Sequence, residues 1–280
     1  MSAKRVRLLG VCAWAASLSS CTDLPSDPAT PFAISFAHAP SPSVVLGDVL
    51  RDSTGAPAKL RAVAFNLRGD TIAGAPITYF LVVRDSQPAT LTDGQITALP
   101  DTAYIFDTLR VVAVAGGIQS TPVRIVVTVR PDSIERVGKD TVRFILPATT
   151  DTLPQSAALF VRLRHVPMAE PARDSVVPAY EVRFRVDSTS SGLADTSYVR
   201  ISDDARQFSP IDTTDVNGLA ARQIRVRRSK FPFPYETIPP GASAVDTVFV
   251  SARAKYRGVE VAGGPIRFRV LVTLAKPPTS

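Results

Sequence analysis

Apolar residues recur at every second position over several long stretches of this sequence. The stretch 180–186 has glutamate or arginine between its apolar positions, and the stretch 266–272 has two arginines between its own. A period of two places the apolar side chains on one face of a β-strand and the charged side chains on the other. No stretch after the first twenty residues shows the 3.6-residue period of an amphipathic helix. The pattern therefore predicts an all-β fold in which each strand buries one face.

Turn signals separate these stretches at intervals of about 8–12 residues, which is typical of a β-sandwich. Asp93-Gly94 and Gly116-Gly117 are two of them. The first half of the chain has an alternating segment at 60–65 and runs rich in β-branched residues at 77–83, 109–115 and 123–129. The first half is therefore expected to be built of strands like the second half.

Arg130–Ser133 contains a proline and separates two similar series of strands. We therefore expect two tandem antiparallel β-sandwiches, residues 41–130 and residues 131–280. The second carries long loops at 166–178 and 229–241 and a short C-terminal tail. The order of strands, turns and closing hairpin is alike in the two halves, as in a tandem repeat.

The first 20 residues have the organisation of a secretory signal peptide. Basic residues at 4–7 precede the apolar run 8–18, which is too short to span a membrane. The run ends in Leu18-Ser19-Ser20-Cys21, which resembles the lipobox of bacterial lipoproteins. That resemblance implies cleavage before Cys21 and lipidation of Cys21, so that the mature protein is anchored to a membrane through lipid. An ordinary cleaved signal followed by a chance cysteine is the alternative.

Cleavage before Cys21 would leave one cysteine and no tryptophan, so no intrachain disulfide is expected. The resemblance implies export to the cell envelope. The residue after the cysteine is Thr22 and not an aspartate, which resembles lipoproteins that are sorted to the outer membrane. Whether the protein lies on the cell surface or on the periplasmic face of that membrane stays open. Residues 21–40 contain four prolines and are predicted to be a flexible tether. Apolar residues alternate at 32–36, so a first strand could instead begin there.

The stretch 62–80 joins a strand, a polar turn with Gly69, a second small turn with Gly74 and another strand. It resembles bacterial immunoglobulin-like domains of the invasin/intimin type, whose Thr-Asp-x-Asn-Gly-x-Ala turn is matched at 214–220. The resemblance covers most of 41–275 and implies immunoglobulin-like sandwiches, which occur in adhesins, surface anchors and enzyme appendages. Arg68-Gly69-Asp70 is also the integrin-binding tripeptide, and we interpret it as the polar turn of such a domain.

Motifs for catalysis and metal binding are scarce. The mature chain has only His38 and His165, and it lacks a Gly-x-Ser-x-Gly elbow, so no enzymatic activity is expected. The spacing of cysteine and histidine excludes a structural zinc site. We expect no metal and no other cofactor, with calcium as the remaining possibility because oxygen ligands gather between 203 and 217. The alternative is that these residues stabilise turns. They are Asp203, Asp204, Asp212, Asp215 and Asn217.

Charge is divided unevenly between the two halves. The whole chain carries a formal charge of +7; residues 22–130 hold 8 basic and 9 acidic side chains, and residues 131–280 hold 21 and 16. Much of the excess falls on arginines at outward strand positions. They are candidates for binding a polysaccharide or another polyanion, and the alternative is a solvated sheet face. The four that we single out are Arg183, Arg185, Arg267 and Arg269.

The loop around 230–236 places Phe231, Phe233 and Tyr235 between prolines. Exposed aromatic side chains on a stiff loop suit contact with a sugar or a surface protein. The alternative is that they fold back over the end of the sandwich. Together these features predict a non-enzymatic envelope lipoprotein for adhesion, binding or spacing at the cell surface. The second hypothesis is a polysaccharide- or polyanion-binding module that uses the basic second domain. Binding to intracellular nucleic acid conflicts with the export signal.

Overall fold

The computed structural model of the chain describes residues 28–82, 88–101, 103, 105–146, 153–166, 175–192 and 196–278. The signal peptide, Cys21 and the first part of the tether lie outside the described residues. Within the described part, the regular structure consists of strands and three short 3₁₀ helices. This confirms the all-β fold.

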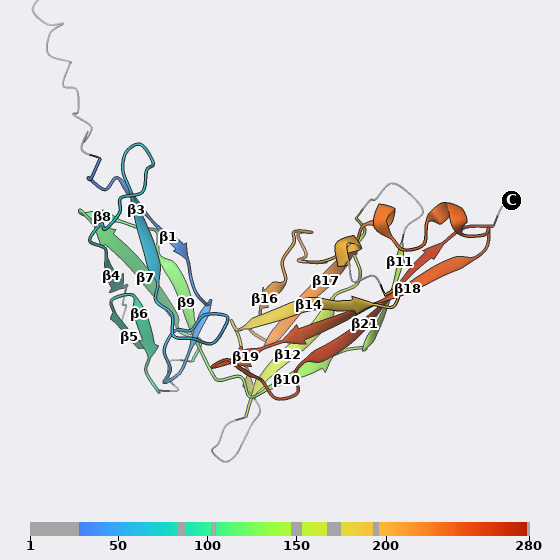
Figure 1. Cartoon of the computed structure of the whole chain (residues 1–280). Helices are drawn as coiled ribbons and strands as arrows, with labels where there is room; N and C mark the ends of the chain where they lie inside the picture. The colour runs from blue at the N-terminus through green and yellow to red at the C-terminus, as the bar shows by residue number, and fades with distance from the viewer. Residues whose placement is uncertain are drawn as a thin grey trace, which may run out of the picture.

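The chain forms two immunoglobulin-like sandwiches that lie end to end at an angle (Figure 1). The strands of the first are β1 (Ala33–His38), β2 (Ser43–Val45), β3 (Arg61–Phe65), β4 (Thr78–Leu81), β5 (Ala89–Thr92), β6 (Gln95–Ala98), β7 (Thr108–Ala115), β8 (Ile118–Gln119) and β9 (Val123–Thr128).

The strands of the second are β10 (Ser133–Val137), β11 (Thr141–Leu146), β12 (Leu159–His165), β13 (Ser175–Val176), β14 (Glu181–Thr189), β15 (Val199–Ser202), β16 (Ile211–Thr213), β17 (Leu219–Val226), β18 (Ser243–Arg253), β19 (Lys255–Tyr256), β20 (Val259–Glu260) and β21 (Ile266–Ala275). The 3₁₀ helices are η2 (Thr196–Tyr198), η3 (Arg228–Lys230) and η4 (Tyr235–Thr237).

Both sandwiches pair an early strand in parallel with their last strand. In the first sandwich β2 runs parallel to β9 in the sheet β2-β9-β7-β4, and β8 pairs with β7. In the second, β11 runs parallel to β21 in the sheet β11-β21-β18-β14-β16. The remaining pairings within these sheets are antiparallel. The two halves therefore share one edge-strand arrangement.

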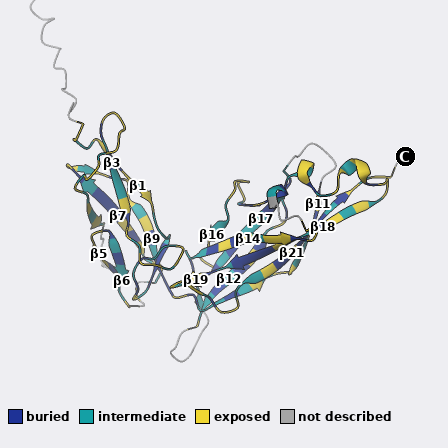
Figure 2. Cartoon of the chain, viewed as in Figure 1, coloured by how far each residue is buried: buried dark blue, intermediate teal, exposed yellow. Residues whose placement is uncertain are grey.

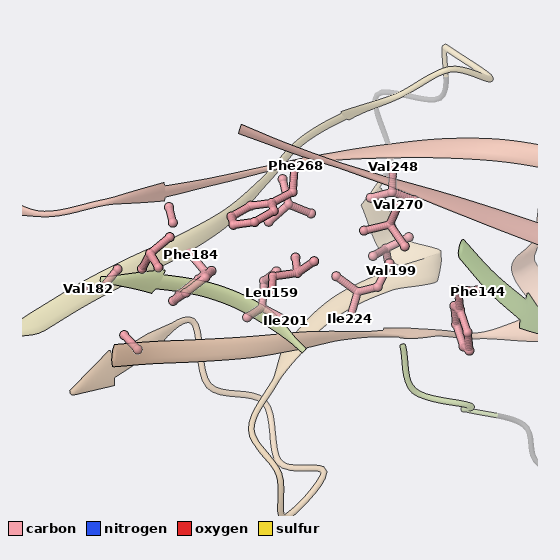
Figure 3. Packing of buried hydrophobic residues seen from close by; sticks show 14 of the residues in the cluster. Phe144, Leu159, Val182, Phe184, Val199, Ile201, Ile224, Val248, Phe268 and Val270 are labelled. Carbon is pink, nitrogen blue, oxygen red and sulfur yellow. The ribbon is translucent and has the colours of Figure 1, made fainter. Parts of the chain in front are cut away.

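Alternating side chains build the core of the second sandwich. Buried and exposed positions alternate along β14 (Figure 2): Val182 and Phe184 are buried, whereas Arg183 and Arg185 are exposed. The two buried side chains point across the gap to Leu159 on β12 and Ile224 on β17, from the sheet β10-β12-β17-β15 (Figure 3). Burying an aliphatic or aromatic side chain contributes about 1.5–3 kcal/mol, so this two-sided core stabilises the second sandwich.

The first sandwich begins earlier than the sequence analysis places it. Strand β1 lies within residues 21–40, which we assigned to the tether, and it pairs antiparallel with β3. Ile34 is buried beside Ala64 and Ala113. The alternation at 32–36 thus marks a strand, and the proline content of this stretch is misleading because the prolines flank β1 and do not interrupt its pairing.

The predicted turns form as expected. Asp93 and Gly94 have φ of 47° and 76° and connect β5 to β6. Gly116 and Gly117 have φ of 56° and 81° and connect β7 to β8. Positive φ at both central residues matches the right-handed twist of the flanking strands.

Candidate ligand-binding surfaces on the second sandwich and at the domain junction

Five arginines lie on the outward side of β14, β18 and β21, which are neighbours in one sheet. Arg183 on β14 stands opposite Arg253 on β18. In the next row, Arg185 and Arg267 flank Ser251 from the two sides, and Arg269 stands opposite Phe249 one row further. We call these residues the arginine face: Arg183, Arg185, Arg253, Arg267 and Arg269. Because neighbouring strands are about 4.8 Å apart, the sheet brings all four arginines singled out from the sequence onto one surface.

The arginine face has few acidic partners. Four of its five arginines, all except Arg253, form no salt bridge with any residue that the structure describes. Arg253 lies 4.0 Å from Glu260, and the carboxylate of Asp187 accepts a hydrogen bond from Ser251 at 2.9 Å. The face therefore presents more positive charge than the neighbouring acidic side chains neutralise.

Several arginines elsewhere in the second sandwich are engaged internally. Arg164 donates to Glu135 at 2.8 Å, and Arg222 pairs with Asp212 at 2.7 Å. Arg225 on β17 donates to the backbone oxygen of Leu153 at 2.9 Å. These side chains stabilise loops and strand edges, so the arginine face differs from them in its free guanidinium groups.

The aromatic loop does not join the arginine face. Phe231 is 5% exposed and packs edge-on against Tyr198 with ring centroids 6.1 Å apart. Its proposed role in ligand binding is therefore wrong, because a buried ring completes the core and cannot reach a ligand. Phe233 is 39% exposed and rests on Phe231, and Tyr235 lies beneath Arg228 and Lys276. The flanking helices η3 and η4, in orange, lie at the end of the second sandwich away from the first (Figure 1).

The acidic residues considered for calcium stabilise turns. Asp215 accepts the backbone N–H groups of Asn217 and Leu219 at 2.8 and 2.9 Å, and Asp203 accepts that of Gln207 at 2.8 Å. Asp212 faces Arg222, as described above. Over the described ranges, no group of three or more His, Cys, Asp or Glu side chains is placed to hold a metal ion.

Two other sequence motifs have local partners. The backbone N–H groups of Arg68 and Asp70 donate to the side-chain oxygen of Asn66 at 2.9 and 3.0 Å, which builds the expected polar turn. The imidazole Nδ1 of His165 lies 2.7 Å from the carboxylate of Asp132. This pair joins the end of β12 to the segment between the sandwiches.

A cleft that the sequence analysis does not anticipate lies where the two sandwiches meet. Its volume is about 450 Å³, and residues from both sandwiches line it. Asp48, only 5% exposed, connects its two walls. Within the first sandwich it accepts hydrogen bonds from Arg51 at 2.8 and 2.9 Å. From the second it accepts Tyr256 Oη at 2.9 Å and Arg257 Nε at 3.0 Å.

The charge of Asp48 is stabilised by these donors. Burial by itself raises the pKa of the carboxyl, but hydrogen bonds from Arg51 and Arg257 outweigh burial and hold the pKa well below its usual range. Further contacts cross the junction. Thr128 Oγ1, fully buried, donates to the backbone oxygen of Pro178 at 2.8 Å, and Leu46 packs against the cores of both sandwiches. The two sandwiches are therefore docked to each other by specific polar and apolar contacts.

No known protein family and no curated protein matches the sequence. Solved structures with a likeness to it are the adhesin InvE of Yersinia pseudotuberculosis, domains 5-6 of the S-layer protein SbsC, and cadherin-like domains 1 to 4 of zebrafish RET. Each is 12% identical to this chain, over 85%, 90% and 85% of it and over 58%, 99% and 48% of the other chain. The TM-scores are 0.34, 0.26 and 0.33. This chain thus spans little more than half of the adhesin. TM-scores this low assign no function to this chain.

The arginine face can be predicted from the sequence because strand alternation is local. The cleft cannot, because Gly47-Asp48 has the sequence of an ordinary turn and the partners Tyr256 and Arg257 are more than 200 residues away. In the part of the chain that the structure describes, no helix is long and apolar enough to cross a membrane.

Proposed function

We propose that this protein is a non-enzymatic lipoprotein of the bacterial cell envelope that binds an anionic polymer, such as an acidic polysaccharide, through the arginine face. The observation that carries the proposal is the grouping of five arginines on three adjacent strands, four of them without a salt bridge to a described residue. Arginine binds carboxylate and sulfate groups through paired N–H donors. A row of such groups on a stiff sheet suits a ligand with repeated negative charges.

The first sandwich has a different part in this proposal. Residues 22–130 carry nearly balanced charge, with 8 basic and 9 acidic side chains. We assign it the role of a spacer between the lipid at Cys21 and the binding surface. A binding surface held away from the membrane by this spacer could bind a polymer outside the cell, and the protein would then serve in adhesion.

A surface protein is a second candidate partner, favoured by exposed apolar side chains on the outward side of the same sheet. Ile145 on β11 is 68% exposed, and Val245 and Phe249 on β18 are 48% and 36% exposed. Apolar side chains next to arginines are common at protein interfaces. This alternative predicts binding that persists at high salt, whereas binding of a polyanion weakens steeply with salt.

Heparin chromatography of the purified mature chain tests the polyanion proposal. Replacing Arg183, Arg185, Arg267 and Arg269 together by serine is expected to lower the salt concentration of elution to about half that of the unmodified chain, because all four arginines of the face that form no salt bridge with a described residue are lost. The matched control replaces four exposed arginines of the first sandwich, Arg61, Arg68, Arg110 and Arg124, by serine. It removes the same total charge and should elute close to the unmodified chain.

Equal losses in the two quadruple variants would show that only net charge matters and would contradict a specific site. Failure of the unmodified chain to bind heparin at physiological salt would overturn the polyanion proposal altogether. Circular dichroism of each variant establishes that the sandwiches remain folded.

The lipid anchor is tested in cells that produce the full chain. Cys21→Ala is expected to move the protein from the membrane fraction to the soluble fraction, because lipid is the anchor that we propose. Protease treatment of intact cells then distinguishes the two faces: trimming of the unmodified protein, with a periplasmic marker protected, places it on the surface. Membrane association that survives Cys21→Ala would contradict the lipoprotein assignment.

A further inference from the structure

The cleft between the sandwiches is continuous with the arginine face. Arg183, Arg185 and Arg253 belong to the face and also line the cleft. We propose that the cleft is a binding site for a short acidic saccharide unit, a carboxylated or sulfated sugar, at the end of the polymer bound on the face. This proposal rests on the proposed function and adds to it a second, enclosed site with its own specificity.

The cleft lining is positively charged. Six basic and three acidic side chains line it, which gives a net charge of +3. The charge of Asp48 is already compensated by Arg51 and Arg257, as described above. Asp52 accepts hydrogen bonds from the hydroxyl and backbone N–H of Thr54 at 2.6 and 2.9 Å. Glu181 is the remaining acid, so the cations on the second-sandwich wall outnumber the carboxylates available to them.

Two polar side chains on the walls have atoms without a partner among the described residues. Ser43 on β2 is 5% exposed, and its hydroxyl makes no hydrogen bond. The Nε of Arg253 on β18 is also without one. A buried polar group without a hydrogen bond destabilises the protein, and a ligand that supplies the bond gains affinity. A ligand in the cleft that has oxygen acceptors can accept a hydrogen bond from Arg253. A ligand that also has hydroxyl groups can supply a hydrogen-bond partner for the Ser43 hydroxyl.

The size of the cleft and the uncharged polar and aromatic side chains in its lining favour a sugar over a simple anion. Small-molecule sites in proteins have volumes of about 300–1,000 Å³, so a cleft of about 450 Å³ admits one or two sugar rings. Hydroxyl groups of Ser41, Ser53 and Thr54 line the first-sandwich wall, and Tyr180 and Tyr256 lie on the other. Hydroxyls and aromatic rings are the groups that pair with sugar hydroxyls and sugar faces.

Isothermal titration calorimetry of the whole mature chain with a sulfated, uronic-acid-containing heparin disaccharide tests this site. Lys255 lines the cleft, is exposed, and lies on β19 outside the arginine face. Lys255→Gln is expected to weaken disaccharide binding about tenfold, and Ser43→Ala about fivefold. The matched control is Lys230→Gln, which removes one exposed lysine from η3 at the far end of the sandwich and should leave the affinity unchanged.

Two further probes identify the ligand class. Maltose, which has no charge, and sodium sulfate, which has no sugar, should each fail to bind. Binding of sulfate as tightly as the disaccharide would overturn the saccharide assignment in favour of a simple anion site. Equal affinities for the disaccharide in Lys255→Gln, Ser43→Ala and the control would overturn the cleft as the site.

Heparin chromatography of the same proteins separates this proposal from the proposed function. Retention of the unmodified chain on heparin without disaccharide binding overturns the cleft site and leaves the arginine face in place. Disaccharide binding without retention overturns the polymer-binding function and leaves the cleft in place.

Discussion

Replacing Asp48 by asparagine is expected to lower the free energy of unfolding by about 2–3 kcal/mol at pH 7 and to release the two sandwiches from each other. Removing one partner from a buried ion pair costs about 3–5 kcal/mol, because the other charge is left without compensation. We expect the lower figure because Arg51 and Arg257, at 22% and 54% exposure, remain partly hydrated. Urea unfolding followed by circular dichroism gives the stability, and small-angle X-ray scattering reports the loss of the fixed angle between the sandwiches.

Asp93→Asn is the matched control for this substitution. Asp93 pairs with Lys59 at 2.5 Å on the surface, where the two side chains are 77% and 52% exposed. Exposed pairs contribute about 0–1 kcal/mol, so Asp93→Asn should change neither the stability by more than that nor the scattering. Identical unfolding and scattering for the two variants would show that Asp48 does not dock the sandwiches.

Acid should have the same effect as Asp48→Asn. The folded-state pKa of Asp48 is held below the ordinary value of 3.8, so its contribution to stability is fully present well above that value. It is lost as the pH falls from about 4 toward the folded-state pKa. The difference in stability between the unmodified chain and Asp48→Asn is therefore expected to be constant from about pH 6 to 8 and to narrow below about pH 4. A difference that stays the same down to pH 3 would contradict this linkage.

The two-residue period of the sequence is sufficient to predict the strands and the arginine face. The alternation within each strand shows which of its faces is buried, so Arg183 and Arg267 could be placed outward without knowledge of the neighbouring strands. That they share one surface depends on β14, β18 and β21 being adjacent. In a sandwich the outward positions of one sheet all face the same side, so the prediction needed only the assignment of these strands to one sheet.

The predictions that fail depend on contacts between distant segments. The sequence around Phe231 cannot show whether its ring folds back, because the outcome rests on Tyr198 and the end of the core. The cleft is harder still, since it forms only when the second sandwich brings Tyr256 to Asp48. Local turn chemistry is the same with or without that docking. The lipid anchor at Cys21 stays a prediction from the sequence.

Replacing Gly55 by alanine is expected to separate the two sandwiches as Asp48→Asn does, through sterics and not through charge. A Cβ on Gly55 would overlap the backbone of Arg257 and Gly258 in the second sandwich. Backbone atoms cannot move aside as the end of a flexible side chain can, so the junction must open. Gly55 also has a φ of 90°, where a residue with a Cβ is strained by about 1–2 kcal/mol. The overlap should add about 1–3 kcal/mol to that cost.

Gly69→Ala separates the two contributions. Gly69 has a φ of 84°, and its Cβ position has no atom within 4 Å. This variant should therefore lose only the conformational part, with unchanged scattering. Gly55→Ala could lower the urea midpoint no further than Gly69→Ala and keep the scattering of the unmodified chain. That result would contradict the close approach of the two sandwiches at Gly55.

The double variant Asp48→Asn/Gly55→Ala tests whether charge and shape act on the same event. Substitutions at independent sites lower the stability additively, whereas those that disrupt one shared interface do not. Once Asp48→Asn has released the sandwiches, the Cβ at position 55 has nothing to overlap, and only the strain at positive φ remains. The double variant is therefore expected to be less destabilised than the two single losses together, by about the 1–3 kcal/mol assigned to the overlap. Full additivity would mean that the two residues stabilise the first sandwich separately and that the junction is not a cooperative unit.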